Sequence, residues 1–135
     1  MTHVEILKKH NLKATPQRLS ILNTLEMYGH VTLEEIEKYT KVNFPTLSLS
    51  TIYRNINEMI KKNVVSEVKI TNSKDYFEIN KEKHAHLICK ECGKIEDFKI
   101  DTQGIVKNIQ SLTNDKIIDA TLNFEVICKE CLSGK

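Results

Sequence analysis

The sequence predicts an α+β fold: an N-terminal winged helix-turn-helix domain, then a small C-terminal α/β dimerisation domain with a four-cysteine zinc site. Three observations support this division. Helical patterns over the first half give way to a β-hairpin pattern. All four cysteines fall in two Cys-x2-Cys pairs in the second half of the chain. The polar segment 80–83 separates the halves, so we expect domains at residues 1–80 and 81–135.

Two helix starts are marked by capping residues. Thr15 before Pro16 predicts one, because a threonine hydroxyl caps free backbone N–H groups and proline fits the first helical turn. Thr32 and Glu35 form a capping box for another helix, which we expect to run to Tyr39.

Two further helices complete the first half. A short one is expected over residues 3–10, and the longest begins at Ser48 or Ser50. The longest helix carries apolar side chains at steps of three and four, which predicts a buried face. That face comprises Leu49, Ile52, Ile56, Met59 and Ile60.

A β-hairpin pattern follows the helices. Residues 64–70 and 76–79 read as strands, with turn residues 71–75 between them. Helices followed by a hairpin make a winged helix-turn-helix, which is a DNA-binding architecture. Small three-helix units also occur in proteins that bind no DNA, so this pattern alone leaves function open.

The second half is too small to be stable on its own core. Strands are expected over 86–89, 94–98 and 121–128, and a helix over 102–112. A unit of about 55 residues rarely holds together without metal, disulfides or a partner.

The cysteines predict the metal. Cys89, Cys92, Cys128 and Cys131 form two pairs separated by 35 residues, and four thiolates in a tetrahedron suit zinc. Two disulfides are the alternative, but disulfides fit secreted chains and nothing at the start of this sequence resembles a signal peptide. We therefore expect a cytoplasmic protein with reduced cysteines.

Composition excludes some classes of protein. The formal net charge of +2 neither requires nor excludes a nucleic-acid partner, and no apolar run is long enough to predict a membrane span. An enzyme with catalytic zinc is a further alternative. Such a zinc keeps an open position, which four thiolates would fill, and no separate nucleophile stands out. We expect no enzymatic activity.

The sequence resembles the ferric uptake regulator family of bacterial metal-dependent repressors. The matching motifs are Leu12-Lys13-Ala14-Thr15-Pro16-Gln17-Arg18, Leu49-Ser50-Thr51-Ile52-Tyr53-Arg54, the segment from His84 to Phe98, and the Cys128/Cys131 pair. The resemblance implies a homodimer that binds palindromic, A·T-rich double-stranded DNA operators. It also implies one structural zinc per subunit and a second, regulatory metal site at the hinge between the domains.

The resemblance assigns His30, Glu78, His84, His86 and Asp97 to one regulatory ion per subunit. Imidazoles and carboxylates together suit Fe(II), Mn(II) or Zn(II) better than Cu(I). Alternation about Ala85 lets His84 and His86 project to the same side if the segment is extended. His3 and His10 are expected to be solvent-exposed and uninvolved.

The helix that begins near Ser48 is the candidate for reading DNA. By resemblance, Tyr53 contacts thymine methyls, Arg54 contacts base or backbone, and Lys13 enters a narrow A·T-rich minor groove. Asn57 lies on the same polar side. Four further residues are expected near phosphates: Thr15, Arg18, Ser50 and Thr51. The alternative is that Arg54, Lys61 and Lys62 form a solvated face with Glu58.

Three kinds of family member fit these residues: a peroxide sensor, an iron-responsive repressor and a zinc-uptake regulator. Asp97 favours a peroxide sensor, in which Fe(II) promotes oxidation of a histidine ligand, by analogy His30 or His84. Glu78 points toward an iron repressor, and a zinc regulator would more often carry cysteine there. Residues 117–120 lack the late histidine of many iron repressors. We expect the peroxide sensor.

Overall fold

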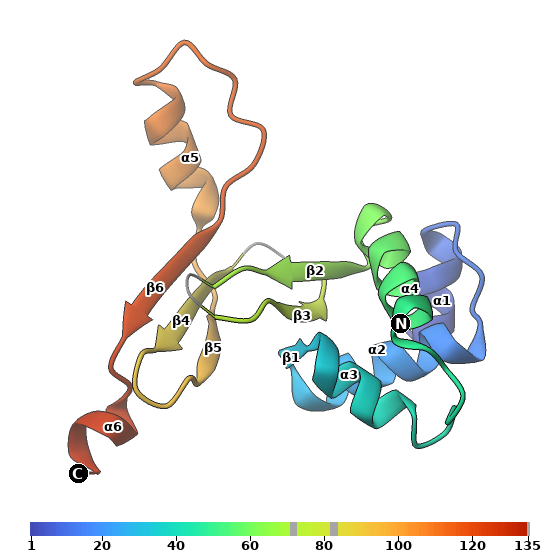
Figure 1. The fold of residues 1–135 in the computed structure, drawn as a ribbon. Coiled ribbons are helices and arrows are strands. Elements are labelled where there is room, and N and C mark those ends of the chain that lie inside the picture. The colour runs from blue at the N-terminus through green and yellow to red at the C-terminus, as the bar shows by residue number, and fades with distance from the viewer. Residues whose placement is uncertain (71–72, 82–83, 135) are drawn as a thin grey trace. The chain divides into compact units, whose positions relative to one another are not determined.

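The computed structural model describes residues 1–70, 73–81 and 84–134 (Figure 1). Its contacts divide the chain into two compact units, Met1–Asn80 and Lys81–Lys135. These are the bounds that the sequence predicts for the two domains. Residues 82–83 of the predicted hinge and 71–72 of the predicted turn lie outside the described residues.

The helices of the first unit begin where their capping residues predict. They are α1 (His3–Lys9), α2 (Pro16–Tyr28), α3 (Leu33–Thr40) and α4 (Leu49–Lys61). The hydroxyls of Thr15, Thr32 and Ser48 each accept a hydrogen bond from a backbone N–H in the following turn. Thr2 and Glu5 form a capping box for α1 as well, a signal that the sequence analysis missed.

A three-stranded antiparallel sheet completes this unit, in the order β1-β3-β2. Its strands are β1 (Val31–Thr32), β2 (Val65–Val68) and β3 (Tyr76–Ile79). β3 has the predicted bounds, and β2 is shorter than the predicted strand. β1 is too short to show any alternation in sequence, so it was not predicted. It exists because Val31 and Thr32 pair with Phe77 and Tyr76.

The core of the first unit lies between the helices and this sheet. Ile52, Ile56 and Met59 of α4 are fully buried within it. Leu49 was expected there too, but it is 39% exposed. Leu49 is the first residue of α4, and helical side chains tilt toward the N-terminus. Its side chain therefore points past the end of the packed face.

The second unit is built on a mixed sheet in the order β5-β4-β6. The strands are β4 (Ala85–Cys89), β5 (Ile95–Phe98) and β6 (Leu122–Val126), and the helices are α5 (Thr102–Gln110) and α6 (Lys129–Ser133). β4 runs antiparallel to β5 and parallel to β6. The short helix α6 was not predicted from the sequence.

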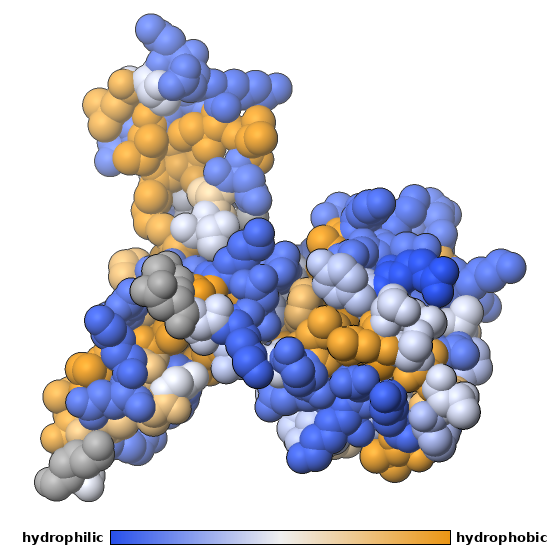
Figure 2. All heavy atoms as spheres, in the orientation of Figure 1, coloured by the Kyte–Doolittle hydropathy of each residue, from blue (hydrophilic) through white to orange (hydrophobic). Residues whose placement is uncertain are grey.

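The apolar face of α5 stays exposed within one chain. No residue of α5 is buried, and Ile105, Ile109 and the following Leu112 are 44%, 49% and 76% exposed. Figure 2 shows hydrophobic residues gathered where Figure 1 places α5. An exposed stripe of this kind marks an interaction surface.

Within the described parts of the chain, no helix has both the length and the apolar character needed to cross a membrane.

Candidate metal centres and nucleic-acid contacts

The four cysteines converge in the second unit. Cys89 ends β4, Cys92 lies in the following turn, Cys128 caps α6 and Cys131 lies within α6. The Sγ atoms of Cys89 and Cys131 are 3.7 Å apart, as are those of Cys92 and Cys128. All four sulfurs lie within 4.8 Å of one another. A zinc–sulfur distance of about 2.3 Å sets tetrahedral sulfurs about 3.8 Å apart, so the cluster fits zinc.

These thiols are free rather than disulfide-bonded, and backbone groups favour the thiolate form of one of them. The Sγ of Cys89 accepts hydrogen bonds from the backbone N–H of Cys92 at 3.5 Å and of Cys128 at 3.3 Å. These bonds lower the pKa of Cys89 to about 6. The neighbouring thiol of Cys128 and then burial raise the pKa of Cys131. Four clustered thiolates require a cation, which zinc would supply.

A histidine and a carboxylate meet in the first unit. The Nε2 of His30 lies 3.1 Å from Oε1 of Glu78, and their side chains are only 12% and 3% exposed. The strand β1 explains the meeting: Val31 pairs with Phe77, so the preceding residue falls beside Glu78. A carboxylate this deeply buried needs a cation or hydrogen-bond donors beside it.

A second histidine–carboxylate cluster lies within the second unit. Asp97 pairs with His86 across β4 and β5. Its Oδ1 lies 3.3 Å from Nε2 of His84 and 3.5 Å from Nε2 of His86. The two Nε2 atoms are 3.0 Å apart. Three ligand atoms therefore point at one another, as they would around an ion. Lys81 also forms an ion pair with Asp97.

Asn123 of β6 is a residue that the sequence analysis missed. Its Oδ1 lies 3.2 Å from Nδ1 of His86. A carbonyl oxygen only accepts, so the tautomer that makes this hydrogen bond has its proton on Nδ1 and, when neutral, its lone pair on Nε2. Partners of this kind fix the tautomer of metal-binding histidines. The signal is the parallel register that sets Asn123 beside His86, and it becomes visible only in the folded chain.

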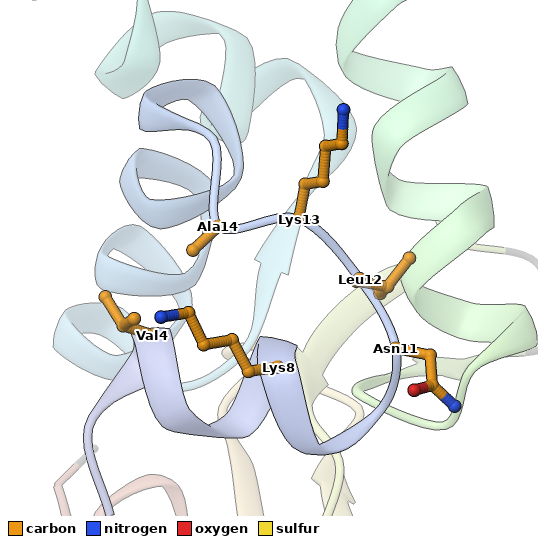
Figure 3. Close-up of a pocket in the computed structure, with 6 residues that line it drawn as sticks. All are labelled: Val4, Lys8, Asn11, Leu12, Lys13 and Ala14. Carbon is orange, nitrogen blue, oxygen red and sulfur yellow. The ribbon is translucent and has the colours of Figure 1, made fainter.

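The predicted DNA-contacting residues all lie in the first unit, with unequal access to solvent. Lys13, Ser50, Tyr53 and Arg54 are exposed, whereas Thr15, Arg18, Thr51 and Asn57 are half-buried. Lys13 lies between α1 and α2, beside a cavity of about 610 Å³ lined also by Val4, Lys8, Asn11, Leu12 and Ala14. Figure 3 shows the Lys13 side chain extending away from Ala14, with Nζ at its far end.

Two histidines expected to be exposed are half-buried instead. The Nε2 of His3 lies 3.0 Å from Oε2 of Glu26, and Nδ1 of His10 lies 2.8 Å from the carbonyl oxygen of Ile6. The packing of α1 explains the difference, because both residues lie at its ends. Neither belongs to a histidine–carboxylate or cysteine cluster among the described residues.

The first unit has the helices and the hairpin of a winged helix, and the second contains a four-cysteine cluster suited to zinc. Each unit also contains a histidine–carboxylate contact. This combination is typical of metal-dependent DNA-binding regulators. Residues 9–125 match the model of the ferric uptake regulator family. The chain therefore belongs to that family, whose members are transcriptional regulators rather than enzymes and bind DNA as dimers.

Individual relatives span two branches of the family. The chain is 32% identical over 127 residues to the peroxide-responsive repressor PerR of Staphylococcus aureus, covering 93% of this chain and 86% of the relative. The Helicobacter pylori ferric uptake regulator Fur is 32% identical with a TM-score of 0.75, over 96% of this chain and 88% of that chain. The Campylobacter jejuni peroxide stress regulator is 31% identical with a TM-score of 0.74, over 97% and 100%.

Proposed function

We propose that this chain is a cytoplasmic, homodimeric repressor whose binding to operator DNA depends on a regulatory Fe(II) or Mn(II) ion. The proposal rests on the observation that each unit brings together some of the side chains predicted to bind the regulatory ion. His30 and Glu78 meet in one unit, and His84, His86 and Asp97 in the other. Their mixed nitrogen and oxygen donors match the preferences of Fe(II) and Mn(II).

One ion shared by both ligand groups gives a physical basis for regulation. A ligand shifts a conformational equilibrium only if it favours one state. An arrangement that brings the two groups together completes the coordination shell, and an open arrangement leaves it incomplete. The regulatory ion therefore favours one orientation of the DNA-binding units in the dimer. The cysteine cluster holds structural zinc and plays no part in this switch.

The DNA contacts are proposed from exposure and position. Tyr53 and Arg54 extend from α4, and Tyr53 is 47% exposed although its ring is largely apolar. We place them in the major groove with Asn57, and Lys13 in the minor groove. Ser50 and Thr51, in the first turn of α4, approach phosphate through hydroxyls and backbone N–H groups. A two-fold dimer implies a palindromic operator.

We infer further that the signal is peroxide. The similarity to the Staphylococcus aureus peroxide-responsive repressor covers most of the chain, and Asp97 is the residue expected at its position in peroxide sensors. Bound Fe(II) would supply the redox chemistry that activates peroxide next to a histidine ring. Overall, a ring C–H bond of His30 or His84 would become a C–O bond, with one oxygen atom taken from peroxide and the other released as water. The oxidised ring would no longer bind metal, and the repressor would release DNA.

An iron-responsive repressor is the second candidate, and two observations favour it. Glu78 is a glutamate where aspartate is expected in peroxide sensors, and the similarity to the Helicobacter pylori regulator is equally strong. Zinc sensing has less support, because the zinc uptake regulator that resembles this chain is 19% identical and so indicates the fold alone.

The test measures DNA binding in the Fe(II) and the Mn(II) forms, each before and after dilute peroxide. The duplex is selected from random DNA by the metal-loaded protein. We expect both forms to bind and only the Fe(II) form to lose binding, with one added oxygen on His30 or His84 by mass spectrometry. Peroxide-insensitive binding in the Fe(II) form would leave the iron-responsive repressor. Binding that is independent of metal would contradict both.

A further inference from the structure

Arg18 joins the start of α2 to the helix proposed to read DNA. Its Nε donates to Oδ1 of Asn55 at 3.2 Å, and its Nη2 forms an ion pair with Glu58. Its Nη1 donates to the backbone carbonyl oxygen of Lys13 at 3.0 Å. Each nitrogen of the guanidinium group therefore has a protein acceptor, and the side chain is only 12% exposed.

This geometry conflicts with the expected phosphate contact. A guanidinium group that binds DNA phosphate must present donors to solvent, whereas three of the five N–H groups of Arg18 bind protein oxygens and its side chain is only 12% exposed. Turning the side chain toward DNA would leave Glu58 without this cation and the carbonyl of Lys13 without this donor. Losing these charge-assisted contacts costs free energy, and a single phosphate contact would replace only part of them.

The contacts of Arg18 connect two parts of the proposed DNA-binding surface. Asn55 and Glu58 are three residues apart, so they lie on one side of α4. Tyr53 and Arg54 are exposed on the same helix. The third acceptor is the main-chain carbonyl of Lys13, whose side chain is exposed to solvent. Arg18 thus holds the backbone that carries the minor-groove lysine against the helix that carries the major-groove residues.

We propose that Arg18 is a positioning residue that fixes Lys13 relative to α4 and makes no direct contact with DNA. This inference rests on the proposed DNA-binding function. In this role Arg18 fixes the distance between the residue that enters the minor groove and the residues that enter the adjacent major groove. Lysine cannot replace it, because the planar fork of arginine reaches three acceptors and a single ammonium group does not.

The decisive variants are Arg18→Lys and Arg18→Gln, tested as full-length, metal-loaded protein on the selected duplex over a range of salt concentrations. A positioning role predicts that both variants bind at least roughly 5-fold more weakly, the lower end of the effect of losing a specific contact. Any fall in the slope of log affinity against log salt comes through Lys13, so Arg18→Gln added to Lys13→Ala leaves the slope of Lys13→Ala unchanged. As the comparison, Lys13→Ala is expected to reduce the slope by about 0.9, the value for one neutralised phosphate.

A direct phosphate contact predicts a different pattern. Arg18→Lys would then keep nearly full affinity, Arg18→Gln would reduce the salt slope even when added to Lys13→Ala, and the losses in Arg18→Gln and Lys13→Ala would add. Positioning predicts that the double variant loses less than the sum, since part of the effect of Arg18 acts through Lys13. Additive losses, or no loss in either Arg18 variant, would overturn the inference.

Glu58→Gln extends the test if the Arg18 variants fold poorly. It frees Arg18 and removes a negative charge, so a phosphate contact predicts tighter DNA binding. Positioning predicts weaker binding. Glu26→Gln, at an exposed position of α2, controls for the change in net charge.

A measurement without DNA separates this inference from the proposed function. Hydrogen exchange of a peptide covering residues 10–18 should be faster in Arg18→Gln than in the wild-type protein. Unchanged exchange would overturn the positioning role even if the wild-type protein binds DNA. If the wild-type protein binds no duplex in any metal form, the proposed function fails and the role of Arg18 in recognition fails with it.

Discussion

The two units of this chain reach stability by different routes. Residues 1–80 enclose a hydrophobic core of twelve buried residues, drawn from all four helices of the unit and from its sheet. In residues 81–134, the buried hydrophobic residues among those described are Ala85, Ile88, Cys89 and Cys128. Two of these four are proposed zinc ligands. Burial of apolar surface is the main favourable term in folding. The first unit therefore has an apolar core of its own, and we infer that the second relies on metal and a partner.

This difference fits the proposed roles of the two units, DNA binding for the first and dimerisation for the second. A self-sufficient first unit can change its orientation without unfolding. In the proposed dimer, zinc and contact with another copy would hold the second unit together, so that it provides a fixed base for that movement.

Removing zinc should unfold the second unit alone. Structural zinc contributes on the order of 10–16 kcal/mol of apparent binding free energy, and few buried apolar side chains remain to compensate. We expect chelation, or Cys128→Ser, to abolish hydrogen-exchange protection over residues 84–134 while residues 1–70 keep theirs. The first unit is the internal control. Protection retained in β4 and β6 after complete zinc removal would contradict the contrast.

We propose that the exposed apolar face of α5 forms the dimer contact, so a charge on this face should dissociate the dimer. Ile109 is 49% exposed in one chain, and burying an aspartate there leaves an unpaired charge at the interface. We expect Ile109→Asp to weaken dimerisation by at least about 2 kcal/mol, the scale of an interface hot spot. Sedimentation equilibrium measures this loss. Val42→Asp, at a position 75% exposed in the first unit, is the matched control and should remain dimeric.

Loss of the Asn123 side chain should weaken the regulatory site without unfolding either unit. Asn123 holds Nδ1 of His86, and removing such partners typically reduces metal affinity about 10- to 100-fold. We expect Asn123→Ala to show this loss in Mn(II) titrations, with zinc content unchanged. Asn108→Ala, at an exposed position of α5, should bind Mn(II) like the wild-type protein. Equal affinity in both variants would remove Asn123 from the site.

The smallest expected effect is a pH dependence confined to the first unit. Burial, then a hydrogen bond to Asp75, raises the pKa of Glu67 in β2 above its usual 4.5. The folded unit therefore holds this proton more tightly than the unfolded chain and loses stability as pH rises through the raised pKa.

Glu67→Gln should remove that loss. Glu67 is largely exposed, so we expect a gain of less than about 1 kcal/mol in free energy of unfolding at neutral pH. Little change is expected in acid below the usual pKa, where Glu67 is protonated in both states. Urea unfolding at several pH values measures this difference, and a loss of stability at neutral pH would contradict it.

Local signals account for what the sequence predicted well. Caps at Thr15, Thr32 and Ser48 act within one helical turn, and the strand at residues 76–79 is marked by its own side chains. The cysteine cluster was predictable because two Cys-x2-Cys pairs are typical of a zinc site. In each case the information lies within a few residues.

Contacts between distant segments account for what was missed. The strand β1 exists only through its pairing with β3, yet it brings His30 to Glu78. Asn123 meets His86 through a parallel register, and Arg18 meets Asn55 and Glu58 at separations of 37 and 40 residues. The sequence motif that contains Arg18 gives no information about these acceptors. The proposed role of Arg18 therefore depends on contacts that only the folded structure shows.

We propose that one regulatory ion takes ligands from both units. The most direct test is to titrate Mn(II) into zinc-loaded wild-type protein, His30→Ala and His86→Ala, and to follow free Mn(II) by electron paramagnetic resonance. We predict one high-affinity Mn(II) per wild-type chain, lost in both variants although the substituted residues belong to different units. If either variant keeps that ion, or if each removes a different one of two ions, the units bind metal separately and the claim is contradicted.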